Sequence, residues 1–243
     1  MLASAKATLR TYAPALAYWA KSVLKGAPGH SRSPGDIFSK IYASGAWGDG
    51  DEPNSGSGSD DSVSAPFVDF VRTFIGEHDV TSVVDLGCGD YRVSGKLADL
   101  PIDYTGVDVV PELVARNTAA FASDHVRFMC RDITKDALPP ADLCIVRQVL
   151  QHLSNEQIAR VLEQLRPFRY AIVAEHHPAR LLRPNLDKDT GADTRIDFDS
   201  GVYLEHAPFS VRNARIVATT PLPALLRNGE YLAVYLIENA AAA

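Results

Sequence analysis

Five short apolar segments recur at regular intervals between residues 82 and 174, and helical patterns separate most of them. These segments are rich in Val and Ile and are Ser82–Leu86, Tyr104–Val109, Val126–Cys130, Leu143–Val146 and Tyr170–Ala174. Pro111–Ala122 and Ser154–Leu165 have helical periodicity, and Ser154 with Gln157 has the pattern of a capping box. Apolar strands that alternate with helices predict an α/β doubly wound fold, with a mostly parallel sheet covered on both faces.

The C-terminal part has a different pattern. A long polar stretch at His176–Ser210 precedes two predicted strands, Ala214–Thr219 and Tyr231–Ile237. Asn228 and Gly229 predict a turn before the second strand, so these two strands are expected to pair antiparallel. The chain has 243 residues, enough for one large core. We expect one domain over residues 63–239, with 176–210 as an insertion that faces the substrate.

Residues 1–62 are expected to form a separate N-terminal segment of helices and a Gly/Ser-rich lid. Lys6 and Arg10 precede the apolar run Tyr12–Ala20, which predicts an amphipathic helix that packs on the domain or meets a membrane surface or a partner. Gly26–Gly35 has the composition of a linker, and a short helix is expected at Asp36–Ser44.

The stretch Gly45–Ser62 is dense in Gly, Ser and Asp and contains a lone tryptophan, Trp47. Such material cannot build a core by itself. Trp47 either anchors this loop to the domain or belongs to a lid that closes over the functional site. The next helix is expected to start at Ser64, with Pro66 in its first turn.

Charge and cysteine content limit the classes of function. The formal net charge is −6, and an acidic chain without a basic stripe is a poor match for nucleic-acid binding. No run reaches the ~18 apolar residues of a membrane span, and no convincing signal peptide is present. Cys88, Cys130 and Cys144 form no CxxC pair and are expected to be small buried side chains in a cytoplasmic protein.

The strongest functional signal is a glycine-rich loop after the first apolar strand. The sequence Asp85-Leu86-Gly87-Cys88-Gly89-Asp90 ends a buried strand and is expected to open into a helix. Its glycines permit a tight turn and a close approach of a ligand to the backbone. Asp108 ends the second strand about twenty residues later, where a carboxylate reaches the hydroxyls of a ribose.

The loop favours S-adenosylmethionine over NAD as the nucleotide. A dinucleotide fingerprint has glycine at the third position of G-x-G-x-x-G, where this chain has Arg92. Asp90 places an anion where a pyrophosphate would bind. A cofactor with a cationic sulfonium and an amino-acid end meets no such repulsion.

These motifs resemble those of class I S-adenosylmethionine-dependent methyltransferases over Ser64 to about Ala174. The resemblance implies a Rossmann-like seven-stranded sheet with one antiparallel strand near the C-terminus. It also implies that Asp85, the two glycines and Asp108 hold the cofactor, and that Asp132 after the third strand faces the adenine. The residues expected to contact the cofactor are Asp85, Gly87, Gly89, Asp108, Val109, Asp132, Ile133, Gln148 and Trp47.

Two further stretches resemble small bacterial methyltransferases of glycan or secondary-metabolite pathways. One is Trp47-Gly48-Asp49-Gly50 followed by Ser55-Gly56-Ser57-Gly58-Ser59, and the other is the segment from Asn185 to Phe209. This resemblance implies a small-molecule or glycan acceptor. Arg195, with Arg180 and Arg183, either holds an anionic or sugar substrate or belongs to a solvated loop surface. Oligomeric state is left open.

Candidate catalytic residues are His152, His176 and Glu175, because each follows or ends a strand at the ligand-binding edge. A histidine with a pKa near 7 suits removal of a hydroxyl proton during methyl transfer, and either histidine is a candidate base. His206 is a weaker rival. Glu175, His176 and His177 together leave open a divalent metal such as Mg²⁺, although their spacing is not diagnostic.

Three activities therefore stay open. The favoured one is O-methylation of a small-molecule or glycan hydroxyl. An N-methyltransferase acting on an amine or protein is an alternative, although Arg147-Gln148-Val149-Leu150 replaces the Asn/Asp-Pro-Pro-Tyr motif of enzymes that methylate planar amines. A non-catalytic module that binds S-adenosylmethionine is the third.

Overall fold

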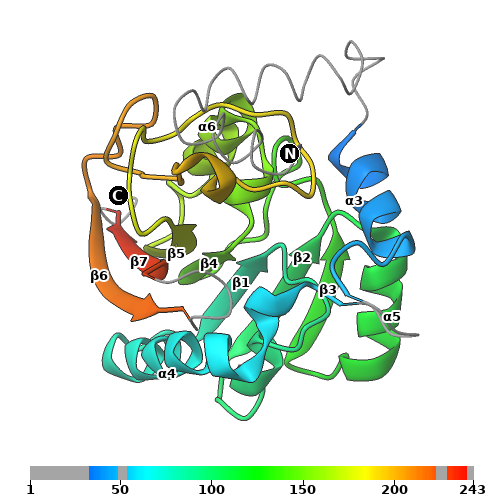
Figure 1. Ribbon diagram of the computed structural model, residues 1–243. Coiled ribbons are helices and arrows are strands. Elements are labelled where there is room, and N and C mark those ends of the chain that lie inside the picture. The colour runs from blue at the N-terminus through cyan, green and yellow to red at the C-terminus, as the bar shows by residue number, and fades with distance from the viewer. Residues whose placement is uncertain (1–32, 49–53, 223–228, 240–243) are drawn as a thin grey trace.

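The computed structural model describes residues 33–48, 54–222 and 229–239 (Figure 1). The amphipathic helix predicted around Tyr12–Ala20 lies outside the described residues, as does Asn228. In the described part of the chain, no helix is long and apolar enough to cross a membrane.

Seven strands of the described chain form one sheet in the order β3-β2-β1-β4-β5-β7-β6. Only β7 is reversed: it pairs antiparallel with both β5 and β6, while the other pairs are parallel. The doubly wound, Rossmann-like sheet with an antiparallel strand near the C-terminus is therefore confirmed. The strands are β1 (Ser82–Leu86), β2 (Asp103–Asp108), β3 (Val126–Cys130), β4 (Leu143–Arg147), β5 (Tyr170–His177), β6 (Ala214–Pro221) and β7 (Tyr231–Glu238).

Helices cover both faces of the sheet, with α4 on one side and α6 on the other (Figure 1). The capping box of α6 is confirmed, because the Ser154 side chain and the Gln157 side chain each bond the other's backbone N–H. The α-helices are α3 (Pro34–Ala43), α4 (Asp61–Glu77), α5 (Pro111–Phe121) and α6 (Asn155–Gln164), with short 3-10 helices η1 (Ser57–Ser59), η2 (Ser94–Leu97), η3 (Leu150–His152) and η4 (Ile196–Phe198).

Three local predictions were wrong. Helix α4 starts at Asp61 with Asp60 as N-cap, one turn before Ser64, because the Asp60 carbonyl oxygen accepts the N–H groups of Val63 and Ser64. The glycine loop opens into no α-helix: only the 3-10 helix η2 follows, since Tyr91 has a φ of 65°, outside the helical region. Cys130 is exposed, because it ends the edge strand β3.

The two core layers follow from the alternation of side chains along each strand. Val83 of β1 and Ile145 of β4 pack with α4, while Val84 and Val146 pack with α6. By the same alternation, Asp85, Asp108 and Arg147 lie on the α4 face; Asp108 and Arg147 end their strands, and Asp85 is one residue before the end of β1. Polar side chains therefore gather at the carboxyl edge of the sheet, where open α/β sheets bind ligands.

Candidate active site

A cavity lies at the carboxyl ends of β1, β2 and β4, between the sheet edge and the N-terminal segment. It contains about 970 Å³ of empty space, including the part open to solvent. This volume is in the range of small-molecule sites. All nine residues predicted to contact the cofactor line it: Asp85, Gly87, Gly89, Asp108, Val109, Asp132, Ile133, Gln148 and Trp47.

The glycine loop forms one wall because its backbone adopts conformations that favour glycine. Gly87 and Gly89 have φ values of 72° and 58°. A Cβ at Gly87 would lie 2.5 Å from Cγ2 of Val149, and one at Gly89 would lie 2.4 Å from Oγ of Ser55. No side chain fits at either position, so the loop backbone itself faces the cavity.

Two buried carboxylates stand at the ends of β1 and β2. Asp108 accepts hydrogen bonds from the Gly89 N–H (3.0 Å) and the Val110 N–H (3.1 Å), which fixes its orientation toward the loop. Asp85 accepts from Ser94 Oγ and from the Tyr104 hydroxyl. Burial raises the pKa of both carboxyl groups, while these hydrogen bonds oppose the rise.

Asp132 lines the cavity at the end of β3, next to Ile133. Its Oδ1 accepts bonds from the N–H (3.0 Å) and the hydroxyl (2.7 Å) of Thr134, and Lys135 lies 3.4 Å from its other oxygen. The carboxylates after β1, β2 and β3 thus follow the strand order across one edge of the sheet.

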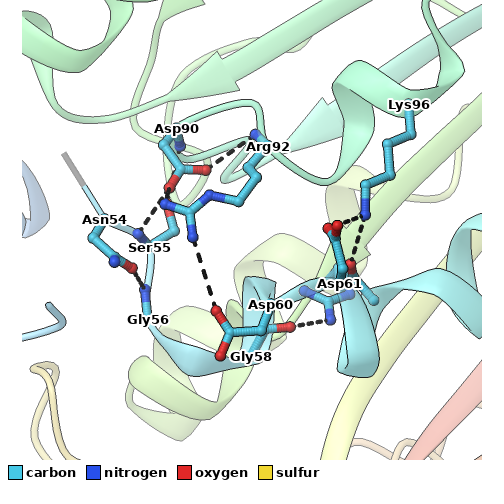
Figure 2. A network of polar contacts seen from close by, with 11 residues as sticks. Asn54, Ser55, Gly56, Gly58, Asp60, Asp61, Asp90, Arg92 and Lys96 are labelled. Atoms are coloured by element: carbon cyan, nitrogen blue, oxygen red, sulfur yellow. Dashed lines mark hydrogen bonds and ion pairs between the residues drawn. The ribbon is translucent and has the colours of Figure 1, made fainter. Parts of the chain in front are cut away.

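The cavity is also lined by Ser55 and Ser59, which belong to residues 54–60, called the covering segment below. Ser55 and Asp90 bond each other in both directions: the Ser55 N–H donates to Asp90 Oδ2 (3.0 Å), and the Asp90 N–H donates to Ser55 Oγ (2.9 Å) (Figure 2). The Ser55 hydroxyl also bonds the Tyr42 hydroxyl at 2.9 Å. Arg92 donates to Asp90 (3.0 Å) and faces Asp60 across 3.9 Å. Residues 54–60 are therefore fastened to the glycine loop.

Trp47 contributes an aromatic wall from the loop after α3. Its ring centroid lies 5.2 Å from those of Tyr42 and His152 and 5.9 Å from that of Phe38. All four rings line the cavity. Sequence reasoning missed Phe38, Tyr42 and Ser55, because residues of a segment remote along the chain give no local signal of the cavity they cover.

His152 is the candidate base that lines the cavity. Its Nδ1 lies 3.2 Å from the carbonyl oxygen of Gly191, and because a carbonyl only accepts, Nδ1 carries the proton. Nε2 is then the acceptor nitrogen of the ring, and Gln151 Nε2 lies 3.4 Å from it as a weak donor. Burial, followed by the charge of Lys188, lowers the pKa of His152 to about 4. The ring is therefore neutral at neutral pH, not poised near 7 as expected.

Glu175 and His176 do not line the cavity. Glu175 is fully buried and accepts the N–H groups of Leu150 (2.9 Å) and Gln151 (3.1 Å). Burial raises its pKa to about 7, against the effect of these bonds and of Arg195. His176 points to the opposite face and bonds Glu230 at 2.8 Å.

The three residues considered for a metal have separate partners. The Nε2 of His177 bonds the carbonyl oxygen of Val202 at 2.9 Å, on the other side of β5 from His176. Among the residues that the structure describes, no group of three His, Cys, Asp or Glu side chains is arranged to hold a metal ion.

Arg195 is buried and binds the protein's own backbone. It donates to the carbonyl oxygens of Leu186, Leu150, Gln151 and Leu153 and to the Asn155 side chain, at 2.7 to 3.3 Å. It therefore ties the 176–210 segment to the turn that carries His152. Arg180 and Arg183 are exposed, as expected for a loop surface.

The chemistry of this cavity fits S-adenosylmethionine. Asp85 and Asp108 supply negative charge for a sulfonium and an ammonium group, and Asp108 has acceptor capacity for ribose hydroxyls. The glycine loop leaves a backbone cradle that a Cβ would fill. Asp132 and Ile133 line the same cavity at the end of β3.

Comparison with known proteins agrees with this geometry. Residues 83–168 match the family model of the methyltransferase domain. No curated protein sequence matches the chain.

Solved structures match the fold at low sequence identity. The N-methyltransferase NodS from Bradyrhizobium japonicum WM9, with S-adenosylhomocysteine, is 16% identical, with a TM-score of 0.58 over 82% of this chain and 98% of that chain. Magnesium protoporphyrin IX methyltransferase from Synechocystis PCC 6803, with S-adenosylmethionine, is 16% identical, with a TM-score of 0.56 over 87% and 100%. The [4+2]-cyclase SpnF is 16% identical, with a TM-score of 0.51 over 73% and 82%.

The family match includes the glycine loop, Asp108 and Asp132, which line the cavity, and the seven strands have the expected order. The chain therefore carries a class I S-adenosylmethionine-dependent methyltransferase domain.

Proposed function

We propose that this methyltransferase transfers the methyl group to a hydroxyl of a small molecule or glycan, with His152 as the base. The observation that supports this proposal is the fixed tautomer of His152. The Gly191 carbonyl oxygen accepts the proton of Nδ1, so the lone pair of the ring is on Nε2. The His152 ring lines the cavity. A neutral imidazole in this state accepts the hydrogen bond of an acceptor hydroxyl.

The cofactor-binding part of the proposal follows the strand ends. Asp108 binds the ribose hydroxyls with Val109 beside it, Asp132 and Ile133 face the adenine, and Asp85, Gly87 and Gly89 hold the amino-acid end. Gln148 and Trp47 line the remaining wall, toward the acceptor. All of these residues line one cavity, which supports the assignment.

S-adenosylmethionine, when bound, supplies a methyl group on a sulfonium centre. The protein's part is to hold the acceptor oxygen in line with that methyl group and to receive the proton of the hydroxyl at Nε2 of His152. The low pKa of His152 keeps Nε2 unprotonated before the reaction, and the Gly191 carbonyl stabilises the imidazolium that forms. Trp47 and Phe38 pack near the ring and reduce the access of water.

The test compares His152→Gln with His206→Gln, a control at an exposed histidine outside the cavity lining. Purified enzyme is screened with sugars and hydroxylated small molecules, and the methylated atom is identified by NMR. We expect methyl ethers as products. We also expect His152→Gln to lower kcat about 100-fold or more, the usual contribution of a general base, with S-adenosylhomocysteine affinity within about threefold of wild type.

A product methylated on nitrogen would refute hydroxyl as the acceptor. Full activity of His152→Gln would show that His152 is not the base. His206→Gln should keep the wild-type kcat. A loss of kcat in His206→Gln, with full activity in His152→Gln, would identify His206 as the base instead.

A further inference from the structure

Among the arginines of the described residues, Arg147 is the one that both ends a central strand and lines the cavity. It is the last residue of β4, on the same face as Asp85 of the neighbouring strand β1. Its Nη2 donates to the carbonyl oxygen of Gly58 at 2.5 Å, and its guanidinium carbon lies 5.5 Å from the centre of the Phe67 ring. These contacts hold the side chain against α4 and the covering segment.

Most of the donor capacity of Arg147 is left over. A guanidinium has five N–H donors in a planar fork, and among the described residues its one hydrogen bond goes to the Gly58 carbonyl oxygen. The Nε atom is buried and has no hydrogen-bond partner. None of the ion pairs among the described residues includes Arg147, and Asp85 accepts hydrogen bonds from Ser94 and Tyr104 instead. A buried donor left in this way is costly unless something else binds it.

The arginine nevertheless keeps its charge. Burial lowers the pKa of Arg147 to about 10, against the effect of Asp85 and Glu175. At neutral pH the cavity therefore contains a fixed cation beside a row of carboxylates. Such a fork matches the two oxygens of a carboxylate. A phosphate has a second negative charge, which Asp85, Asp90 and Asp108 in the same cavity would repel.

We propose that Arg147 is a carboxylate-binding residue of this cavity. Two ligands present that group: the amino-acid end of S-adenosylmethionine, whose ammonium group would face Asp85, and an acceptor that carries a carboxylate. The second source rests on the proposed function, because it requires an acceptor bound in the same cavity. Neither source requires that the methylated atom is oxygen.

The experiment uses the full chain and calorimetric titration rather than turnover. Wild type, Arg147→Gln and Arg147→Lys are titrated with S-adenosylhomocysteine and with 5′-methylthioadenosine, which has the same nucleoside and no amino-acid end. Arg92→Gln is the matched control, because Arg92 also fastens the 54–60 segment, through Asp60 and Asp90, but does not line the cavity (Figure 2).

If the cofactor supplies the carboxylate, Arg147→Gln weakens S-adenosylhomocysteine binding about 10- to 100-fold, the scale of a charged hydrogen-bonded pair. Binding of 5′-methylthioadenosine then stays within about twofold, and Arg147→Lys recovers part of the loss. If the acceptor supplies the carboxylate, wild type and Arg147→Gln bind S-adenosylhomocysteine equally. In the presence of saturating S-adenosylhomocysteine, wild type then binds glucuronate better than glucose, or 4-hydroxybenzoate better than phenol. Arg147→Gln removes this preference for the carboxylate.

The proposal is overturned if Arg147→Gln matches wild type for every one of these ligands. It is also overturned if both nucleosides lose affinity equally, or if Arg92→Gln reproduces the loss, since both results indicate damage to the covering segment. The O-methylation proposal is tested independently, because it fails if the product is methylated on an atom other than oxygen.

Discussion

Glu175 and Arg195 hold the same turn from its two sides. Glu175 accepts the N–H groups of Leu150 and Gln151, and Arg195 donates to the carbonyl oxygens of Leu150, Gln151 and Leu153. The turn between them is η3, which ends at His152. Two buried charges from β5 and from the 176–210 segment therefore position a ring in the cavity without entering it.

Removing this clamp is expected to destabilise the protein. Arg195→Met leaves the carbonyl oxygens of Leu150, Gln151, Leu153 and Leu186 buried without this donor, at a cost of about 3 kcal/mol or more in the free energy of unfolding. Denaturant unfolding followed by circular dichroism measures this loss. Arg160→Met removes an exposed i,i+4 pair with Glu156 and should cost below about 0.5 kcal/mol. Equal losses in the two variants would contradict the clamp.

The carboxylate at the end of β2 should dominate recognition of the ribose. Asp108→Ala is expected to weaken S-adenosylhomocysteine binding about 10- to 100-fold, because charge-assisted hydrogen bonds to the ligand are lost. Calorimetry measures the affinity. Asp103→Ala is the control, since Asp103 begins the same strand but is exposed and pairs with His125. Wild-type affinity in Asp108→Ala would remove this residue from the site.

The covering segment should control ligand release. Ser55→Ala removes the acceptor of the Asp90 N–H and the partner of the Tyr42 hydroxyl. We expect S-adenosylhomocysteine to dissociate about fivefold faster, the equivalent of one net hydrogen bond. Stopped-flow displacement measures the rate. Ser57→Ala, at an exposed serine of the same segment, should leave it unchanged. An unchanged rate in Ser55→Ala would show that the segment does not limit release.

The low pKa of His152 predicts a dependence of stability on pH. An unfolded chain has a histidine pKa near 6.5, and the folded pKa is about 4. Between these values the unfolded state binds more protons, so this residue makes stability fall as the pH is lowered. From about pH 7 to about pH 5 the contribution is at most about 2 kcal/mol, and less because part of the ring is exposed.

His152→Gln removes that contribution, and denaturant unfolding at the two pH values compares it with wild type. The variant should lose less stability on acidification than wild type does. His125→Gln, at an exposed histidine, should behave like wild type. The same acid loss in His152→Gln and wild type would contradict the shifted pKa.

The sheet could be predicted from the sequence because its signals are local. Runs such as Leu143–Val146 and Tyr170–Ala174 are apolar throughout, as expected of strands that are buried on both faces. The strand ends at Asp85 and Asp108 then located one edge, and the cofactor residues chosen there line the cavity. The missing helix after the glycine loop had no such signal, because it depends on the backbone conformation at Tyr91.

The roles of His176 and Glu175 could not be read from their place at a strand end. Alternation places them on opposite faces of β5, where His176 bonds Glu230 and Glu175 accepts N–H groups of the η3 turn. Both partners are remote along the chain. The burial of Arg195 and the cover formed by Tyr42 and Ser55 depend on the same kind of long-range contact. Sequence spacing contains no information about such partners.

The close approach of Val149 to Gly87 constrains how this domain can change during evolution. An alanine at position 87 would meet the Val149 side chain, and its φ of 72° would remain unfavourable even with more room. A smaller residue at position 149 would relieve the contact but not the backbone conformation, so glycine stays favoured at 87 whichever residue occupies 149. Position 149 can therefore vary while Gly87 is kept, and the reverse is not open to selection.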